Sequence, residues 1–163
     1  MADKVLASVL IEPKKFELRE FDMPEIGPDE GILRVERCGV CGSDVHGYER
    51  MGEGQRILGH ENLGFIAKIG TNASKKWGVV EGDRVALEEY VPCGSCEMCR
   101  SGNYRFCPQT SAFGHDPSTP RLWYGSTALT VEPALWGGYS QYMYMHAGAV
   151  VHKVPTHIDA SEA

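Results

Sequence analysis

The chain has 163 residues, a length typical of one compact domain that buries a sizeable core. Hydrophobic residues make up 42% and charged residues 23%, a balance that excludes collagen, coiled coil and wholesale disorder. Sixteen Lys and Arg against 22 Asp and Glu give a formal net charge of −6. Because proteins that bind a phosphate backbone carry basic surfaces, we expect no nucleic acid partner.

The first residues and the apolar runs bear on the compartment. No apolar run approaches the roughly 18 to 20 residues that a membrane helix needs, and residues 1–5 lack the long apolar segment of a signal peptide. We therefore expect a cytoplasmic protein with no membrane partner. In a reducing compartment the six cysteines favour metal binding over disulfides.

Short strands separated by Gly-rich turns dominate the predicted secondary structure. Apolar or alternating runs predict strands at residues 5–10, 16–21, 32–37, 63–69, 84–87, 139–145 and 149–151. The first two flank a short turn and predict a hairpin. This pattern predicts a mainly β fold of the barrel type.

Residues 109–135 interrupt this pattern, because they show the period of neither a strand nor a helix. We interpret them as a long, irregular surface loop. Loops of this length are uncommon in compact domains and are usually functional or mobile, so we expect this one to cover a cleft.

Four of the six cysteines occupy one short stretch with the spacing Cys93-x2-Cys96-x2-Cys99-x7-Cys107. Four thiolates are the number that a closed, tetrahedral zinc site requires, and they leave no position for a substrate. The spacing predicts a structural zinc lobe over residues 92–108. Two disulfides, four unrelated thiols and an iron–sulfur cluster are the alternatives.

A second group of candidate ligands precedes that lobe and comprises Cys41, His46, His60 and Glu61. A cysteine, a histidine and a carboxylate suit a mixed-ligand zinc site that leaves one coordination position open. A redox dithiol formed with Cys38 is the alternative, although such dithiols prefer a βαβ context. We interpret Cys38 as a small buried hydrophobe at the end of its strand.

The order of these motifs resembles that of a known family. The motifs are Cys41-Gly42-Ser43-Asp44-Val45-His46, Gly59-His60-Glu61, the four-cysteine pattern, and Gly82-Asp83-Arg84-Val85. Together they resemble the N-terminal catalytic domain of zinc-dependent medium-chain alcohol dehydrogenases, over nearly the whole chain. The resemblance implies a GroES-like β-barrel with short helices and a structural-zinc lobe.

The resemblance also implies roles for individual residues. Cys41 and His60 would bind the catalytic zinc, and Glu61 would be an exchangeable ligand. Ser43 and His46 would form a proton relay beside the substrate and the cofactor. Asp44 would orient His60, as metal-bound imidazoles generally require, while the structural zinc would be held by Cys93, Cys96, Cys99 and Cys107.

The implied activity is the oxidation of an alcohol or polyol to an aldehyde or ketone, with hydride transfer to NAD or NADP. The chain contains no dinucleotide fingerprint and no βαβ alternation that would carry one. We therefore expect the Rossmann domain to lie outside residues 1–163, in a longer protein that is a homo-oligomer.

The last residues also bear on the extent of the protein. Asp159 and Glu162 have the spacing of a capping box, which predicts that a helix begins here and that the natural protein continues. The alternative interpretation is a stand-alone, zinc-stabilised β-barrel that binds a partner and has no catalytic activity.

Overall fold

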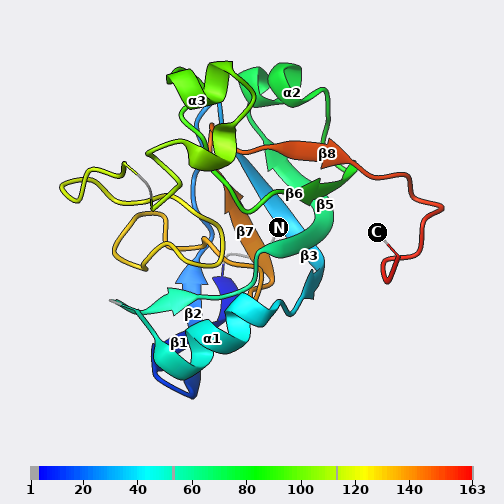
Figure 1. Cartoon of the computed structure of the whole chain (residues 1–163). Coiled ribbons are helices and arrows are strands. Elements are labelled where there is room, and N and C mark those ends of the chain that lie inside the picture. Colours follow the sequence, from blue (N-terminus) through cyan, green and yellow to red (C-terminus); the bar gives the residue numbers. More distant parts are fainter. Residues whose placement is uncertain (1–3, 53, 113, 163) are drawn as a thin grey trace.

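The computed structural model describes residues 4–52, 54–112 and 114–162 and is mainly β (Figure 1). Its strands are β1 (Lys4–Glu12), β2 (Lys15–Asp22), β3 (Gly31–Gly39), β4 (Arg56–Ile57), β5 (Glu61–Ile69), β6 (Arg84–Leu87), β7 (Tyr142–Met145) and β8 (Val151–Lys153). Its helices are α1 (Gly42–Arg50), α2 (Thr71–Trp77), α3 (Glu97–Arg100) and the short 3₁₀ helix η1 (Tyr104–Phe106).

The strands form two antiparallel sheets, one with the order β2-β1-β4 and one with the order β7-β3-β5-β6-β8. The predicted hairpin is confirmed, because β1 pairs with β2 from Lys4 opposite Asp22 onward. A bridge between Ala7 and Ser140 joins the two sheets just before β7. The sheets therefore enclose a common interior, as expected for a barrel.

The core lies between the two sheets and follows from the alternation along β1. Val5, Ala7 and Val9 are fully or almost fully buried on the inner face of this strand. They belong to one cluster with Leu33 and Trp136, and burial of each large apolar side chain contributes about 1.5–3 kcal/mol. This core fixes the strands whose ends carry the candidate ligands.

The two longer helices are local insertions between strands. Helix α2 begins where the backbone N–H groups of Asn72 and Ala73 donate to the carbonyl of Pro28, at 2.8 and 3.1 Å. It ends at Gly78, whose φ of 66° is a left-handed conformation that glycine adopts without strain. None of the helices in the described part of the chain is long and apolar enough to cross a membrane.

The structure corrects the expectation about the long irregular segment. Residues 109–135 do not form a loop that lies wholly on the surface, because Tyr124 and Leu135 are fully buried in the core. No helix is formed at Asp159 within the described residues, but its carboxylate accepts the backbone N–H of Ser161 at 2.8 Å, as an N-cap residue does. The helix start therefore stays a prediction.

Candidate metal centres

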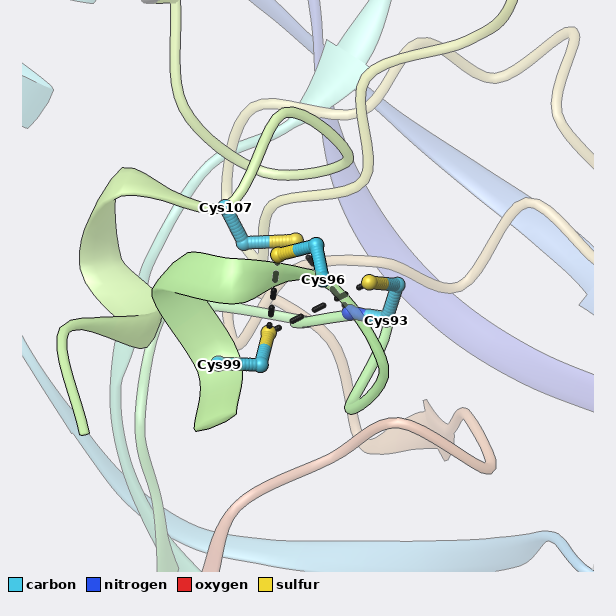
Figure 2. Close-up of side chains that lie close together, drawn as sticks. All are labelled: Cys93, Cys96, Cys99 and Cys107. Carbon is cyan, nitrogen blue, oxygen red and sulfur yellow. Dashed lines mark hydrogen bonds between the residues drawn. The ribbon is translucent and has the colours of Figure 1, made fainter. Parts of the chain in front are cut away.

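The four clustered cysteines converge in the lobe that follows β6. Figure 2 shows the sulfurs of Cys93, Cys96, Cys99 and Cys107 turned toward one another. All four Sγ atoms lie within 4.8 Å of one another, with Cys96 and Cys99 separated by 3.5 Å and Cys93 and Cys99 by 4.0 Å. A tetrahedron with zinc–sulfur bonds of about 2.3 Å has edges of about 3.8 Å. The donor set therefore fits one zinc ion.

Short, local elements place these sulfurs. Cys96 precedes α3 and Cys99 lies on it, so one helical turn separates the two thiols. Gly94 and Gly102 have φ values of 76° and 80°, which allow the chain to reverse on either side of this turn. Hydrogen bonds from Ser95 lower the pKa of Cys93 and favour the thiolate that a metal ion requires.

This geometry contradicts the alternatives for the lobe. All four cysteines are free thiols, so the expected alternative of two disulfides is wrong. They form one cluster, so they are not unrelated thiols. Sulfurs this close together leave room for a single ion, but not for several irons and sulfides between them.

The second candidate site joins two loops that the β3–β5 pairing brings together. Gly39, the last residue of β3, lies opposite Glu61, the first residue of β5. Cys41 follows β3 and His60 precedes β5, so both reach the same end of the sheet. Ligand atoms of Cys41, His60 and Glu61 lie within 4.8 Å of one another. This is the mixed thiolate, imidazole and carboxylate set that suits a catalytic zinc.

Asp44 on α1 holds the two loops of this site together. Its Oδ2 accepts the backbone N–H of Cys41 at 2.9 Å, and its Oδ1 accepts the backbone N–H of Gly59 at 3.1 Å. The same Oδ1 lies 3.6 Å from Nδ1 of His60. Because Asp44 engages Nδ1, the other ring nitrogen of His60 is left to face a metal ion.

Ser43 lies beside that second ring nitrogen, with its Oγ 3.4 Å from Nε2 of His60. Hydrogen bonds from Ser43 also lower the pKa of Cys41, which favours the thiolate. His46 is exposed on α1 and has no side-chain hydrogen bond or ion pair with any residue that the structure describes. The structure thus brings Cys41, Ser43, His60 and Glu61 together and leaves His46 apart.

Cys38 lies one residue before the end of β3 and is partly buried. Burial raises the pKa of its thiol to about 12, so it is a poor thiolate. It is a free thiol rather than a partner of Cys41. The two candidate sites adjoin different helices, α1 at the bottom and α3 at the top of Figure 1.

Sequence reasoning missed one carboxylate at this site. Oε2 of Glu89 lies 3.7 Å from Nε2 of His60 and accepts the indole N–H of Trp123 at 2.9 Å. A cavity of about 110 Å³ adjoins these groups and is lined in part by Ser43, His60 and Trp123, with Arg56 on its wall. The only signal in the sequence is a pair of acidic residues directly after a strand, which is too common to single out.

Comparison with known proteins identifies the family. Residues 27–156 match the family model described as the alcohol dehydrogenase GroES-like domain. The chain belongs to this family. The predicted fold class, a mainly β GroES-like domain with a cysteine lobe that fits zinc, is thereby confirmed, as is the resemblance to medium-chain zinc alcohol dehydrogenases.

Curated members of the alcohol dehydrogenase family match this chain over most of its length. A probable alcohol dehydrogenase of Mycobacterium tuberculosis is 40% identical over 152 residues, which cover 92% of this chain and 39% of the relative. The erythritol/L-threitol dehydrogenase of Mycolicibacterium smegmatis is 32% identical and covers 99% of this chain and 43% of the relative. The chain thus spans about two fifths of the length of these relatives.

Solved structures of alcohol dehydrogenases and related enzymes share the fold. An alcohol dehydrogenase of Thermotoga maritima superposes with a TM-score of 0.75 at 26% identity, covering 96% of this chain and 42% of that one. The acetophenone reductase of Geotrichum candidum, solved in complex with NAD, superposes with a TM-score of 0.74 at 28% identity, covering 98% and 42%.

Proposed function

We propose that this GroES-like domain is the catalytic domain of a longer, zinc-dependent dehydrogenase that oxidises an alcohol or polyol to an aldehyde or ketone. The observation that carries the proposal is the convergence of Cys41, His60 and Glu61 beside a small cavity, separate from a closed four-cysteine site. The four-cysteine set suits a structural zinc ion, and the mixed set of thiolate, imidazole and carboxylate suits a catalytic one. A relative that acts on erythritol and L-threitol supports a polyol as one substrate class.

The residues of the open site divide the work. When bound there, zinc supplies the positive charge that makes a substrate hydroxyl acidic. Cys41, His60 and Glu61 would hold the ion, and Asp44 would keep the imidazole of His60 oriented by its contact with Nδ1. Ser43 lines the cavity next to His60 and would take the proton of the substrate hydroxyl.

We assign the outward transfer of that proton to His46. It follows Ser43 by three residues on α1, the spacing at which side chains neighbour each other on a helix. Its imidazole is exposed to solvent, where a histidine side chain can pass a proton to water. Rotation of the Ser43 or His46 side chain, or of both, would bring the two into contact.

The hydride acceptor would be NAD or NADP, bound to a Rossmann domain outside residues 1–163. The NAD complex of the acetophenone reductase and the longer chains of the relatives support this division. Ser43 and His46 would face the nicotinamide side of the cofactor across the domain boundary. Full turnover therefore requires the longer protein.

Replacement of a ligand tests the proposal. In the full-length protein, Cys41→Ser should abolish formation of NADH or NADPH from a series of polyols and simple alcohols. It should also lower the zinc content from two ions per chain to one, as measured by elemental analysis. Cys38→Ser is the matched control and should retain both. Turnover that persists in Cys41→Ser would overturn the proposal and favour a non-catalytic, zinc-stabilised binding module.

A further inference from the structure

The proposed set of metal ligands leaves one carboxylate at the open site unexplained. Oε2 of Glu89 lies 3.7 Å from Nε2 of His60, the ring nitrogen that Asp44 does not engage. Glu89 is a partly buried residue, with 27% of its side chain exposed. A partly buried carboxylate that lies beside the metal-facing nitrogen of a ligand lies where an ion would be attracted to it.

Two consecutive residues of the segment 109–135 hold Glu89 in this position. The indole N–H of Trp123 donates to its Oε2 at 2.9 Å, and the backbone N–H of Tyr124 donates to its carbonyl at 2.9 Å. Both the side chain and the backbone of Glu89 are thereby fixed by the same segment. A hydrogen bond to an ionised carboxylate is stronger than one between neutral groups.

Trp123 is itself fixed on several sides. Its ring stacks on Tyr90 with centroids 5.7 Å apart, and the guanidinium of Arg121 lies 4.8 Å from the ring centroid. Its backbone N–H donates at 2.8 Å to the hydroxyl of Thr127, which is 2% exposed. The indole therefore presents its N–H to Glu89 from a fixed position, although the described residues of its segment form neither helix nor strand.

The charges at the site explain what such a carboxylate would do. The carboxylates of Asp44, Glu61 and Glu89 lie at one end of the sheet beside Cys41 and His60, and like charges in a partly buried site repel one another. A divalent cation removes this repulsion, and each further carboxylate strengthens its attraction. Glutamate oxygen is also an ordinary zinc ligand.

We propose that Glu89 is a further carboxylate of the metal site at Cys41 and His60, and that Trp123 positions it, so that metal occupancy is coupled to the segment 109–135. This inference rests on the proposed function, because it assumes that the site binds a metal ion. It assigns to the irregular segment a defined task, which is to hold a metal-site carboxylate by an indole hydrogen bond.

Metal titration tests the role of Glu89. The protein is prepared with zinc in the cysteine lobe, and Co²⁺ is then titrated into the second site while its visible absorption is recorded. We expect Glu89→Gln to weaken Co²⁺ binding by about tenfold to a hundredfold, the usual effect of losing a partner of metal ligands. Glu88→Gln is the matched control, because Glu88 is adjacent but bonds to His152 and Tyr104 instead. This control should bind Co²⁺ as the unaltered protein does.

Tryptophan emission tests the coupling. Co²⁺ in the second site should change the emission of the unaltered protein and of Trp77→Phe, since the indole of Trp77 bonds to Ala149 in another part of the fold. In Trp123→Phe the change should be lost, and Co²⁺ should bind about threefold to tenfold more weakly, as expected for one lost hydrogen bond.

The outcomes separate this inference from the proposed function. Equal Co²⁺ affinity in the unaltered protein and in Glu89→Gln would overturn the inference and leave the catalytic zinc site intact. An emission change that survives in Trp123→Phe would overturn the coupling to the segment. Failure of the unaltered protein to bind any second metal ion would overturn the proposed function and this inference with it.

Discussion

Oδ1 of Asp44 lies 3.6 Å from Nδ1 of His60, while Nε2 of the same ring faces Ser43 and Glu89. The two nitrogens of His60 therefore have different surroundings. Nδ1 faces a buried carboxylate, and Nε2 faces polar groups at the cavity. Asp44 is 4% exposed and also accepts two backbone hydrogen bonds. A single buried carboxylate thus orients the ligand and holds the loops that carry it.

Replacement of Asp44 by Asn should impair both metal binding and folding. We expect metal affinity at the Cys41–His60 site to fall by about tenfold to a hundredfold, because the imidazole loses its orienting carboxylate. The single amide oxygen of Asn cannot replace both carboxylate oxygens, so unfolding should be easier by about 1–3 kcal/mol. Co²⁺ titration and urea unfolding measure the two effects.

The exposed Asp29 provides the control for this change. Asp29→Asn removes the same charge from the chain and should alter neither the metal affinity nor the stability. If Asp44→Asn binds Co²⁺ as tightly as Asp29→Asn does, His60 does not depend on Asp44 for its orientation.

Loss of the lobe metal should unfold the lobe and spare the sheets. Helices α3 and η1 are very short, so without an ion few interactions hold them in place. Cys96→Ser removes one of four ligands, and amide protons in residues 93–107 should then exchange much faster, while those of β3 and β5 keep their protection. Cys38→Ser is the control. Slow exchange throughout the lobe of Cys96→Ser would show that the metal is not needed for its structure.

Arg84 provides a test of a buried polar network distant from both metal sites. Its side chain is 3% exposed, and it donates to Oε2 of Glu36 at 2.7 Å and to the carbonyl of Ile158 at 2.6 Å. Arg84→Met should lower the free energy of unfolding by about 1–3 kcal/mol, because two acceptors lose their donor while Glu36 keeps some access to water.

Urea unfolding measures this effect, and Lys4→Met is the comparison. Lys4 pairs with Asp22 at the surface, where ion pairs contribute little. The stability of Lys4→Met should be unchanged within error. Equal stability of the two variants would mean that burial does not strengthen the Arg84 network.

Much of the barrel could be predicted because its strands carry an alternating pattern. The inward positions Val5, Ala7 and Val9 are visible in the sequence and buried in the structure. The bounds of α1 could not be predicted, because Asp44 is its only buried residue and it therefore has no apolar period. Buried anchors in 109–135, such as Tyr124, escape prediction for the same reason.

The two metal clusters differ in how far the sequence predicts them. The four lobe cysteines are close in sequence, so their spacing alone predicts a cluster. Cys41 and His60 meet only through the pairing of β3 with β5, so their residue types suggested a mixed-ligand site and the family resemblance supplied their individual roles. Glu89 reaches the site through Trp123, which lies 34 residues further along the chain. A contact that depends on an irregular segment leaves no periodic signal in the sequence.

The last prediction concerns pH and His146, which follows β7. Its Nδ1 accepts the backbone N–H of Gly148 at 2.9 Å, and its ring lies 5.8 Å from that of Trp136. Burial is the main reason why the pKa of this histidine lies below 6.5. The charge of Glu30 raises the pKa, and the charge of Lys76 lowers it further. The neutral form is therefore favoured in the folded protein.

The sign of the pH dependence follows from this shift. Above pH 6.5 His146 is neutral in both states and contributes no pH dependence. As the pH falls below 6.5 the unfolded chain binds the proton first, so the folded state loses stability until the pH passes the lower, folded pKa. His146→Asn keeps an acceptor for Gly148 but cannot titrate. It should therefore not show this part of the loss of stability at low pH. Urea unfolding of both proteins between about pH 7 and 5 measures the difference in their stability. Any metal release at low pH affects both proteins alike, so it cancels from this difference. Parallel curves over this range would show that His146 titrates alike in the folded and unfolded states.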